Sequence, residues 1–159
     1  AGMAQENIEE FGAAAQGEEA LSGLLTAAAG ELGGVTASQV AESLGGLVTA
    51  ADRAAVTGVF ADYLAESTRT AVATGIYGWL DDDLAFTRDW GFSLDLVRVP
   101  LSIWQGDQDA MVPLSHGQWL AKAIPMAYSH LISGEGHLTL IQARIGDILD
   151  DLVALAAGR

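Results

Sequence analysis

The stretch IWQGDQDAMVP, Ile103–Pro113, determines how the rest of this sequence is interpreted. It completes an apolar run, VPLSIW, and continues with a glycine, two aspartates separated by one residue, an apolar pair and a proline. The run predicts a buried β-strand, with Pro100 near its start, where a strand tolerates proline. Ligands of parallel sheets bind outside the carboxyl ends of the strands. Asp107 and Asp109 are therefore both candidate site residues.

Downstream of this stretch, the sequence predicts a helix, a second strand and a long final helix. The segments are SHGQWLAKAI (115–124), YSHLIS (128–133) and, after the turn GEGH, an apolar helical face from Leu138 onward. Strand, helix, strand and helix predict two parallel strands joined by a right-handed crossover, and hence an α/β fold. Parallel strands are normally buried on both faces inside a larger sheet, so we expect the pair to be part of a longer α/β fold.

Upstream of residue 93 the sequence is rich in alanine, glycine and acids, and it predicts helices rather than strands. One helix is indicated by a stripe of apolar residues at helical spacing: Val56, Val59, Phe60, Tyr63 and Leu64. The segment DDDLAFTRDW (81–90) predicts a short helix with its acids in a solvated first turn, rather than a metal site. We therefore expect a helical region over 1–92, an α/β region over 93–159, and a chain that is mostly helical.

Composition narrows the classes of function. The 159 residues carry a formal net charge of −14, with 21 acids against 7 bases, and the only lysine is Lys122. Such a balance disfavours binding to nucleic-acid phosphates and to anionic membranes. The sequence has no cysteine, so disulfides and thiolate metal sites are excluded and a cytoplasmic location is expected. No apolar run approaches the roughly 20 residues that span a bilayer.

A histidine follows the second predicted strand, as the aspartates follow the first. Because the strands are joined by one crossover, a carboxylate after the first strand and His137 after the second can meet. A carboxylate that orients an imidazole, and an imidazole that takes a proton, are what a nucleophile needs. Gly134 and Gly136 would allow a tight turn that presents the His137 ring.

The segment WQGDQDAMVPLSHGQWLAKAIPMAYSHLISGEGHLTL (104–140) resembles the C-terminal end of an α/β-hydrolase. That family typically has an apolar strand, Gly-x-x-Asp followed by an apolar residue and Pro, then a helix, a strand and Gly-His. The matching positions, specific over roughly residues 95 to 142, are Gly106, Asp109, Val112, Pro113, Gly136 and His137. The resemblance implies that Asp109 is the triad acid and His137 the triad base, and that Asp107 is a loop residue.

The resemblance extends more loosely to the upstream helices, which look like the lid of such enzymes. GIYGWLDDDLAFTRDWGFSL (75–94) is similar to a lid-to-core junction in an esterase- and peptidase-like branch of the family. The sequence departs from the family in lacking Gly-x-Ser-x-Gly, the motif that carries the nucleophile. In the family order the nucleophile precedes the acid and the base, so it is expected before Ala1.

These points define the expected function. We expect the C-terminal part of a serine-type hydrolase of ester or related acyl or amide bonds, carrying the acid and base but inactive alone. No cofactor and no metal are expected. The expected partners are a small-molecule substrate of the full-length enzyme, and either the missing N-terminal half or a second copy bound through an exposed sheet edge.

Two other hypotheses stay open on the sequence alone. Asp107-Gln108-Asp109 after an apolar strand resembles the Asp-x-Asp of magnesium-dependent haloacid-dehalogenase-type phosphotransferases, in which the first aspartate is the nucleophile. Against this hypothesis, the sequence has no suitably placed lysine, and the hypothesis does not explain Gly136-His137. The other hypothesis is a non-enzymatic helical module that oligomerises, since an uncovered strand edge favours pairing with another chain.

Overall fold

The computed structural model describes residues 2–158, which form a mostly helical α/β structure with one two-stranded parallel sheet. The chain divides into two compact units. The helical unit comprises Ala4–Leu47 and Val56–Gly91, and the α/β unit comprises, among the described residues, 2–3, Val48–Ala55 and 92–158. The expected boundary near residue 92 coincides with one break between the units. Val48–Ala55 differs from expectation, because it packs with the α/β unit although it lies within the helical part of the sequence.

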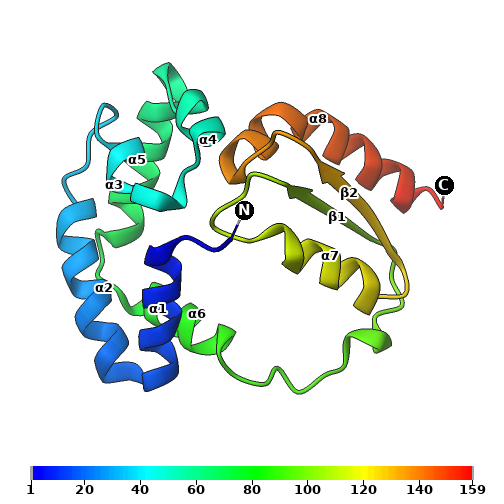
Figure 1. Cartoon of the computed structure of the whole chain (residues 1–159), viewed down its shortest axis with the longest axis horizontal. Helices are drawn as coiled ribbons and strands as arrows, with labels where there is room; N and C mark the ends of the chain where they lie inside the picture. Colours follow the sequence, from blue (N-terminus) through cyan, green and yellow to red (C-terminus); the bar gives the residue numbers. More distant parts are fainter. Residues whose placement is uncertain (1, 159) are drawn as a thin grey trace. The chain divides into compact units, whose positions relative to one another are not determined.

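The α/β unit is built on strands β1 (Leu101–Gly106) and β2 (Ala127–Ile132). They pair in parallel, from Leu101 opposite Ala127 to Gly106 opposite Ile132. Helix α7 (Leu114–Ala123) connects the strands, and α8 (His137–Ala156) follows β2. Figure 1 shows α7 and α8 on opposite sides of the strands. The unit also contains α4 (Ala50–Ala55), which packs against α8, and the short 3-10 helix η2 (Leu94–Leu96).

Alternate side chains of β1 explain how both helices attach to the sheet. Ser102 and Trp104 face α8, where the Ser102 hydroxyl donates to the Asp151 carboxylate and the Trp104 indole donates to Ser102 Oγ at 2.8 Å. His130 of β2 stacks on Trp104 with ring centroids 4.0 Å apart, and its Nε2 lies 3.2 Å from Asp151 Oδ2. Gln105 faces the other way and lies against α7. The polar cluster on Asp151 therefore anchors the C-terminal half of α8 to the sheet.

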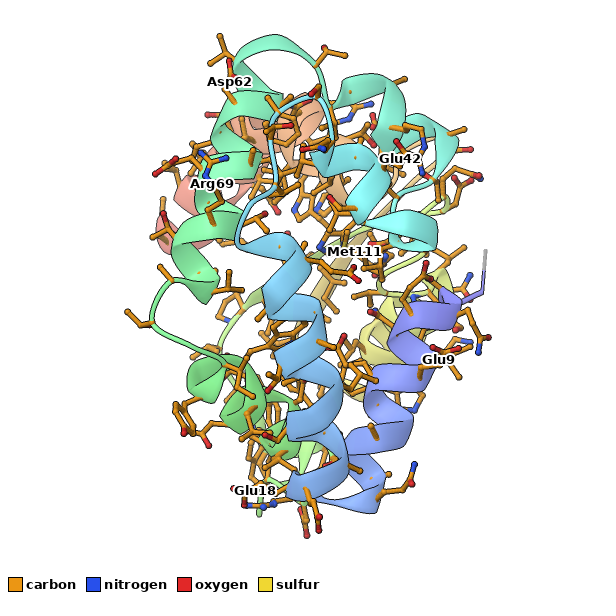
Figure 2. The ribbon with its side chains drawn as sticks, turned by 90° about the vertical axis from the view of Figure 1, so that its left-hand side faces the viewer. Glu9, Glu18, Glu42, Asp62, Arg69 and Met111 are labelled. Carbon is orange, nitrogen blue, oxygen red and sulfur yellow. The ribbon has the colours of Figure 1, made fainter. Side chains whose placement is uncertain are left out.

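The helical unit consists of α1 (Gln5–Gln16), α2 (Glu18–Leu32), α3 (Val40–Ser43), the 3-10 helix η1 (Gly45–Leu47), α5 (Gly58–Val72) and α6 (Tyr77–Phe86). Figure 2 looks onto α1 and α2, which pack along each other; Glu9 lies on α1 and Glu18 begins α2. The core joins α1, α2 and α6 through Ala13, Ala14, Leu21, Leu25, Leu80 and Leu84. Small alanines on α1 allow close packing against the leucines of the other two helices.

Helix α5 exists where the apolar stripe predicts it, but its buried face only partly coincides with that stripe. Ala61 and Ala65 are buried, whereas Val59 is 85% exposed and Tyr63 is 66% exposed. In Figure 2, Asp62 and Arg69 lie on this helix, and Arg69 donates to the Val35 carbonyl at 2.6 Å. The packed face is therefore shifted around the helix from the expected stripe, because Phe60 and Leu64 are half-buried beside the two alanines while Val59 and Tyr63 face outward. The small residues bring α5 closer to its neighbours than the larger apolar ones could.

The prediction of a solvated first turn at Asp81–Asp83 is wrong. Helix α6 begins at Tyr77, so the acids lie in its middle, and Asp83 is only 4% exposed. Burial and the neighbouring Glu10 carboxyl raise the pKa of Asp83 to about 7. Glu10 in turn accepts a hydrogen bond from the Trp79 indole at 2.7 Å. Packing of Trp79 and Leu80 into the core extends the helix upstream and places Asp83 inside the unit.

Candidate active site

The site is built around Asp109, which lies in the loop after β1 and is 3% exposed. Its Oδ1 accepts hydrogen bonds from the backbone amides of Met111 and Val112 at 2.9 and 2.8 Å. These local bonds close a tight turn of the kind that aspartate favours before Pro113. The turn fixes the carboxylate and leaves Oδ2 directed at other partners.

His137 is the first residue of α8, and its Nδ1 lies 2.9 Å from Asp109 Oδ2. The structure thus brings together the two residues that the sequence selected. The Gln105 side-chain amide also donates to Asp109 Oδ2, at 3.1 Å, and to the Val112 carbonyl at 2.9 Å. Gln105 therefore supports the carboxylate from within β1, a role that sequence reasoning missed.

The electrostatics of the pair favour a carboxylate facing an imidazole. Burial alone would raise the pKa of Asp109, but the hydrogen bonds from His137, Val112 and Met111 outweigh it, and the net pKa is lowered. The hydrogen bond to Asp109 raises the pKa of His137 against the opposing effect of burial, and the charges of Asp109 and Asp52 add to the increase. Each group therefore stabilises the charged form of the other.

Close approach by another residue explains the two glycines Gly106 and Gly136. A Cβ on Gly106 would overlap the Glu135 carbonyl, and one on Gly136 would overlap the Asp52 carboxylate. Gln108 donates its backbone amide to the Glu135 carbonyl at 2.9 Å, which ties the loop after β1 to the turn after β2. These contacts hold the two loops at the separation that the Asp109–His137 hydrogen bond requires.

Asp107 is placed apart from this pair and braces the turn that precedes His137. Its carboxylate accepts hydrogen bonds from the Ser133 hydroxyl and the Gly134 amide, both at 2.8 Å. The Gly134 amide, the Ser133 hydroxyl and the Gln108 side chain lower the pKa of Asp107. Within residues 2–158, no group of three or more His, Asp or Glu side chains is arranged to hold a metal ion.

The residue that sequence reasoning missed most clearly is Asp52 on α4, which is fully buried. Its Oδ2 accepts from the His137 amide at 3.1 Å, and its Oδ1 accepts from the Leu138 and Thr139 amides at 2.8 and 3.0 Å. These three amides belong to the first turn of α8, and first-turn amides have no hydrogen-bond acceptor within their own helix. One signal was available in the sequence: Gly136 precedes the helix and offers no capping side chain, so the cap had to come from elsewhere.

A cavity of about 240 Å³ opens beside the pair and lies within the α/β unit. It is lined by Trp104, Gln105, Asp109, Val112, His137, Leu140 and Ile141. Within the described part of the chain, this lining includes no serine, threonine or lysine that could act as a nucleophile. The cavity therefore combines an apolar wall with one oriented imidazole.

Comparison with known protein families, with curated proteins and with solved structures finds no match to this chain. In the described part of the chain, no helix has both the length and the apolar character needed to cross a membrane.

Proposed function

We propose that Asp109 and His137 are the acid and the base of a serine-type α/β-hydrolase that cleaves ester or related acyl or amide bonds. The single observation that carries the proposal is the hydrogen bond between the buried Asp109 carboxylate and His137 Nδ1, at 2.9 Å. A carboxylate on Nδ1 selects the tautomer in which Nε2 carries the lone pair, and Nε2 is then able to take a proton from a hydroxyl. A cytoplasmic location stays a prediction.

The mechanism follows from this arrangement. His137 Nε2 takes the hydroxyl proton as the nucleophile attacks the substrate carbonyl, and Asp109 stabilises the imidazolium that forms. The imidazolium then gives the proton to the leaving group, which departs and leaves an acyl-enzyme. Water attacks the acyl-enzyme with His137 as base again, releasing the acid and regenerating the hydroxyl. The apolar cavity wall formed by Trp104, Leu140 and Ile141 offers a surface for the acyl group.

The nucleophile in this proposal comes from a segment outside the 159 residues. The absence of Gly-x-Ser-x-Gly from the sequence and the cavity lining both support this assignment. The same assignment implies that the oxyanion hole is also contributed from outside the chain. The 159-residue chain alone is therefore expected to show no turnover.

The experiment is to trap the acyl-enzyme. We expect the enzyme encoded by the full reading frame to give a burst of p-nitrophenol from p-nitrophenyl butyrate, because p-nitrophenolate is a good leaving group and acylation is then faster than deacylation. Digestion and mass spectrometry after rapid acid quenching should place the butyryl group on a serine outside the 159 residues. A burst with the adduct on Asp107 would contradict the proposal, as would turnover by the 159-residue chain alone that survives His137→Ala.

A second candidate function is association through the sheet and α8. Among the described residues β1 pairs only with β2, so each strand has one unpaired edge. Helix α8 also exposes an apolar line at helical spacing: Ile141, Ile145, Leu149, Leu152 and Val153. Such surfaces favour binding of further strands or of a second copy of the chain.

Sedimentation velocity tests this second candidate. We expect the 159-residue chain to sediment as a dimer or larger species, with the proportion rising with concentration. Replacing Ile145 and Leu149 by glutamate should shift the chain toward monomer, because the charges would have to be buried in the interface. A monomer at all concentrations would contradict self-association and leave the hydrolase proposal unaffected.

A further inference from the structure

We propose that Asp52 is a positioning residue for His137, holding its backbone at the start of α8 and placing a second negative charge beside the imidazole. The inference rests on the proposed function, since positioning matters for catalysis only if His137 is the base. Asp52 belongs to α4 and is separated from His137 by 85 residues in sequence. The local motif around Gly136-His137 signals that an outside cap is needed but does not identify Asp52.

The geometry is that of a helix cap supplied from another element. The Asp52 carboxylate accepts hydrogen bonds from the amides of His137, Leu138 and Thr139, and from the Thr49 hydroxyl at 3.4 Å. Gly136 at the N-cap has no side chain, and its own amide donates to Thr139 Oγ1 at 2.7 Å. Two carboxylate oxygens therefore satisfy three first-turn amides of α8, and they set the position of the His137 Cα relative to Asp109.

The negative charge of Asp52 also offsets the helix dipole at the first turn of α8, where His137 lies. The positive end of the helix dipole lies at the first turn, where it disfavours a protonated histidine. A carboxylate on the same amides offsets that effect, which would otherwise oppose the imidazolium that forms during catalysis. Without Asp52, only Asp109 would act against the helix dipole.

Two further carboxylates, Asp107 and Glu135, lie on the loops next to His137. Asp107 accepts hydrogen bonds from Ser133 and Gly134, and Glu135 lies 3.8 Å from Arg144 Nε. The carboxylates whose charge raises the pKa of His137 are Asp109 and Asp52. Asp109 acts through the ring nitrogen and Asp52 through the backbone side of the same residue.

The test separates charge from capping with a matched pair of double variants. Asp52→Ala removes the carboxylate and, with it, the atoms that a Cβ at Gly136 would overlap. Gly136 has an extended backbone conformation that any residue can adopt, so either Ser or Asp can be introduced there as a local cap. Ser and Asp cap helices about equally well, but only Asp restores the charge.

Three measurements are made on the 159-residue chain: NMR titration of the His137 ring, chemical shifts of its backbone, and exchange of the α8 first-turn amides. Asp52→Ala should speed amide exchange by about tenfold, the ratio that corresponds to the loss of a cap. Adding Gly136→Ser should restore amide protection but leave the His137 pKa lower than in the wild type. Adding Gly136→Asp should restore both. In the enzyme from the full reading frame, the pH at which kcat/KM falls on the acid side should change in the same order among these variants.

The inference is overturned if the variant with Gly136→Ser titrates like the wild type, because Asp52 would then be only a structural cap. It is also overturned if Asp52→Ala leaves both amide exchange and titration unchanged. If the first-turn amides lose protection but the double variants do not fold, the milder Asp52→Asn decides by the same titration. Failure of the hydrolase proposal would give a different result: no acyl-enzyme would form, while the His137 titrations of the Asp52 variants would still follow the order given above.

Discussion

Replacing His137 by alanine in the enzyme from the full reading frame is expected to lower kcat for p-nitrophenyl butyrate by about 10⁴- to 10⁶-fold. Among the described residues that line the cavity, His137 carries the one imidazole, and its Nε2 can take the nucleophile's proton and return it to the leaving group. KM should change little, because the ring contributes more to the transition state than to substrate binding. Steady-state kinetics at a pH above the His137 titration measure the effect.

The matched control for this variant is His116→Ala on α7. His116 is exposed and lies outside the cavity lining, so its removal should leave kcat within about twofold of the wild type, as for most surface substitutions. Retention of a tenth or more of the activity in His137→Ala would show that another group acts as the base. Equal losses in both variants would indicate damage to the fold rather than to the site.

The Asp109–His137 pair could be selected from sequence because its determinants are local. An apolar strand followed by Gly106 and an Asp-x-x-x-Pro turn places one group, and Gly136 before a helix places the other. Parallel pairing through a single crossover then puts both loops at the same edge of the sheet, and the structure brings the two side chains to hydrogen-bonding distance. The coarse fold class, α/β and mostly helical, could be predicted for the same reason.

Asp52 could not be selected, because its role depends on a contact between α4 and α8 that no periodicity encodes. The segment TAADRAA has the composition of the neighbouring helical region, and only the fold assigns it to the α/β unit. The start of α6 differs from the sequence prediction for a related reason. The rule that acids favour a first turn placed it at Asp81, whereas burial of Trp79 and Leu80 extends the helix to Tyr77. Tertiary packing outweighed a local preference that is worth roughly 1 kcal/mol or less.

Asp109→Asn is expected to lower kcat by about 10⁴-fold while keeping the shape of the loop. The asparagine oxygen can still accept from the Met111 and Val112 amides, but its NH₂ group would then face His137 Nδ1. Nδ1 would have to accept that hydrogen bond, so the proton would move to Nε2, which could no longer serve as the base. Asp107→Asn is the matched control, and it should retain at least about a tenth of the activity, because Asp107 braces a turn and does not touch the imidazole.

The pH dependence gives Asp109→Asn a second readout. In the wild type the base is lost as pH falls through the raised pKa of His137, so the acid limb of kcat/KM should move to lower pH in the variant. For stability, the lowered pKa of Asp109 makes a contribution that is lost as pH falls, and the raised pKa of His137 makes one that is lost as pH rises. The ion pair should therefore stabilise the fold most between about pH 4 and pH 6.5, the unfolded values of the two groups. Urea unfolding of the 159-residue chain at pH 5.5 and pH 9 measures this, and a wild-type advantage that is larger at pH 9 would contradict a pair with these charges.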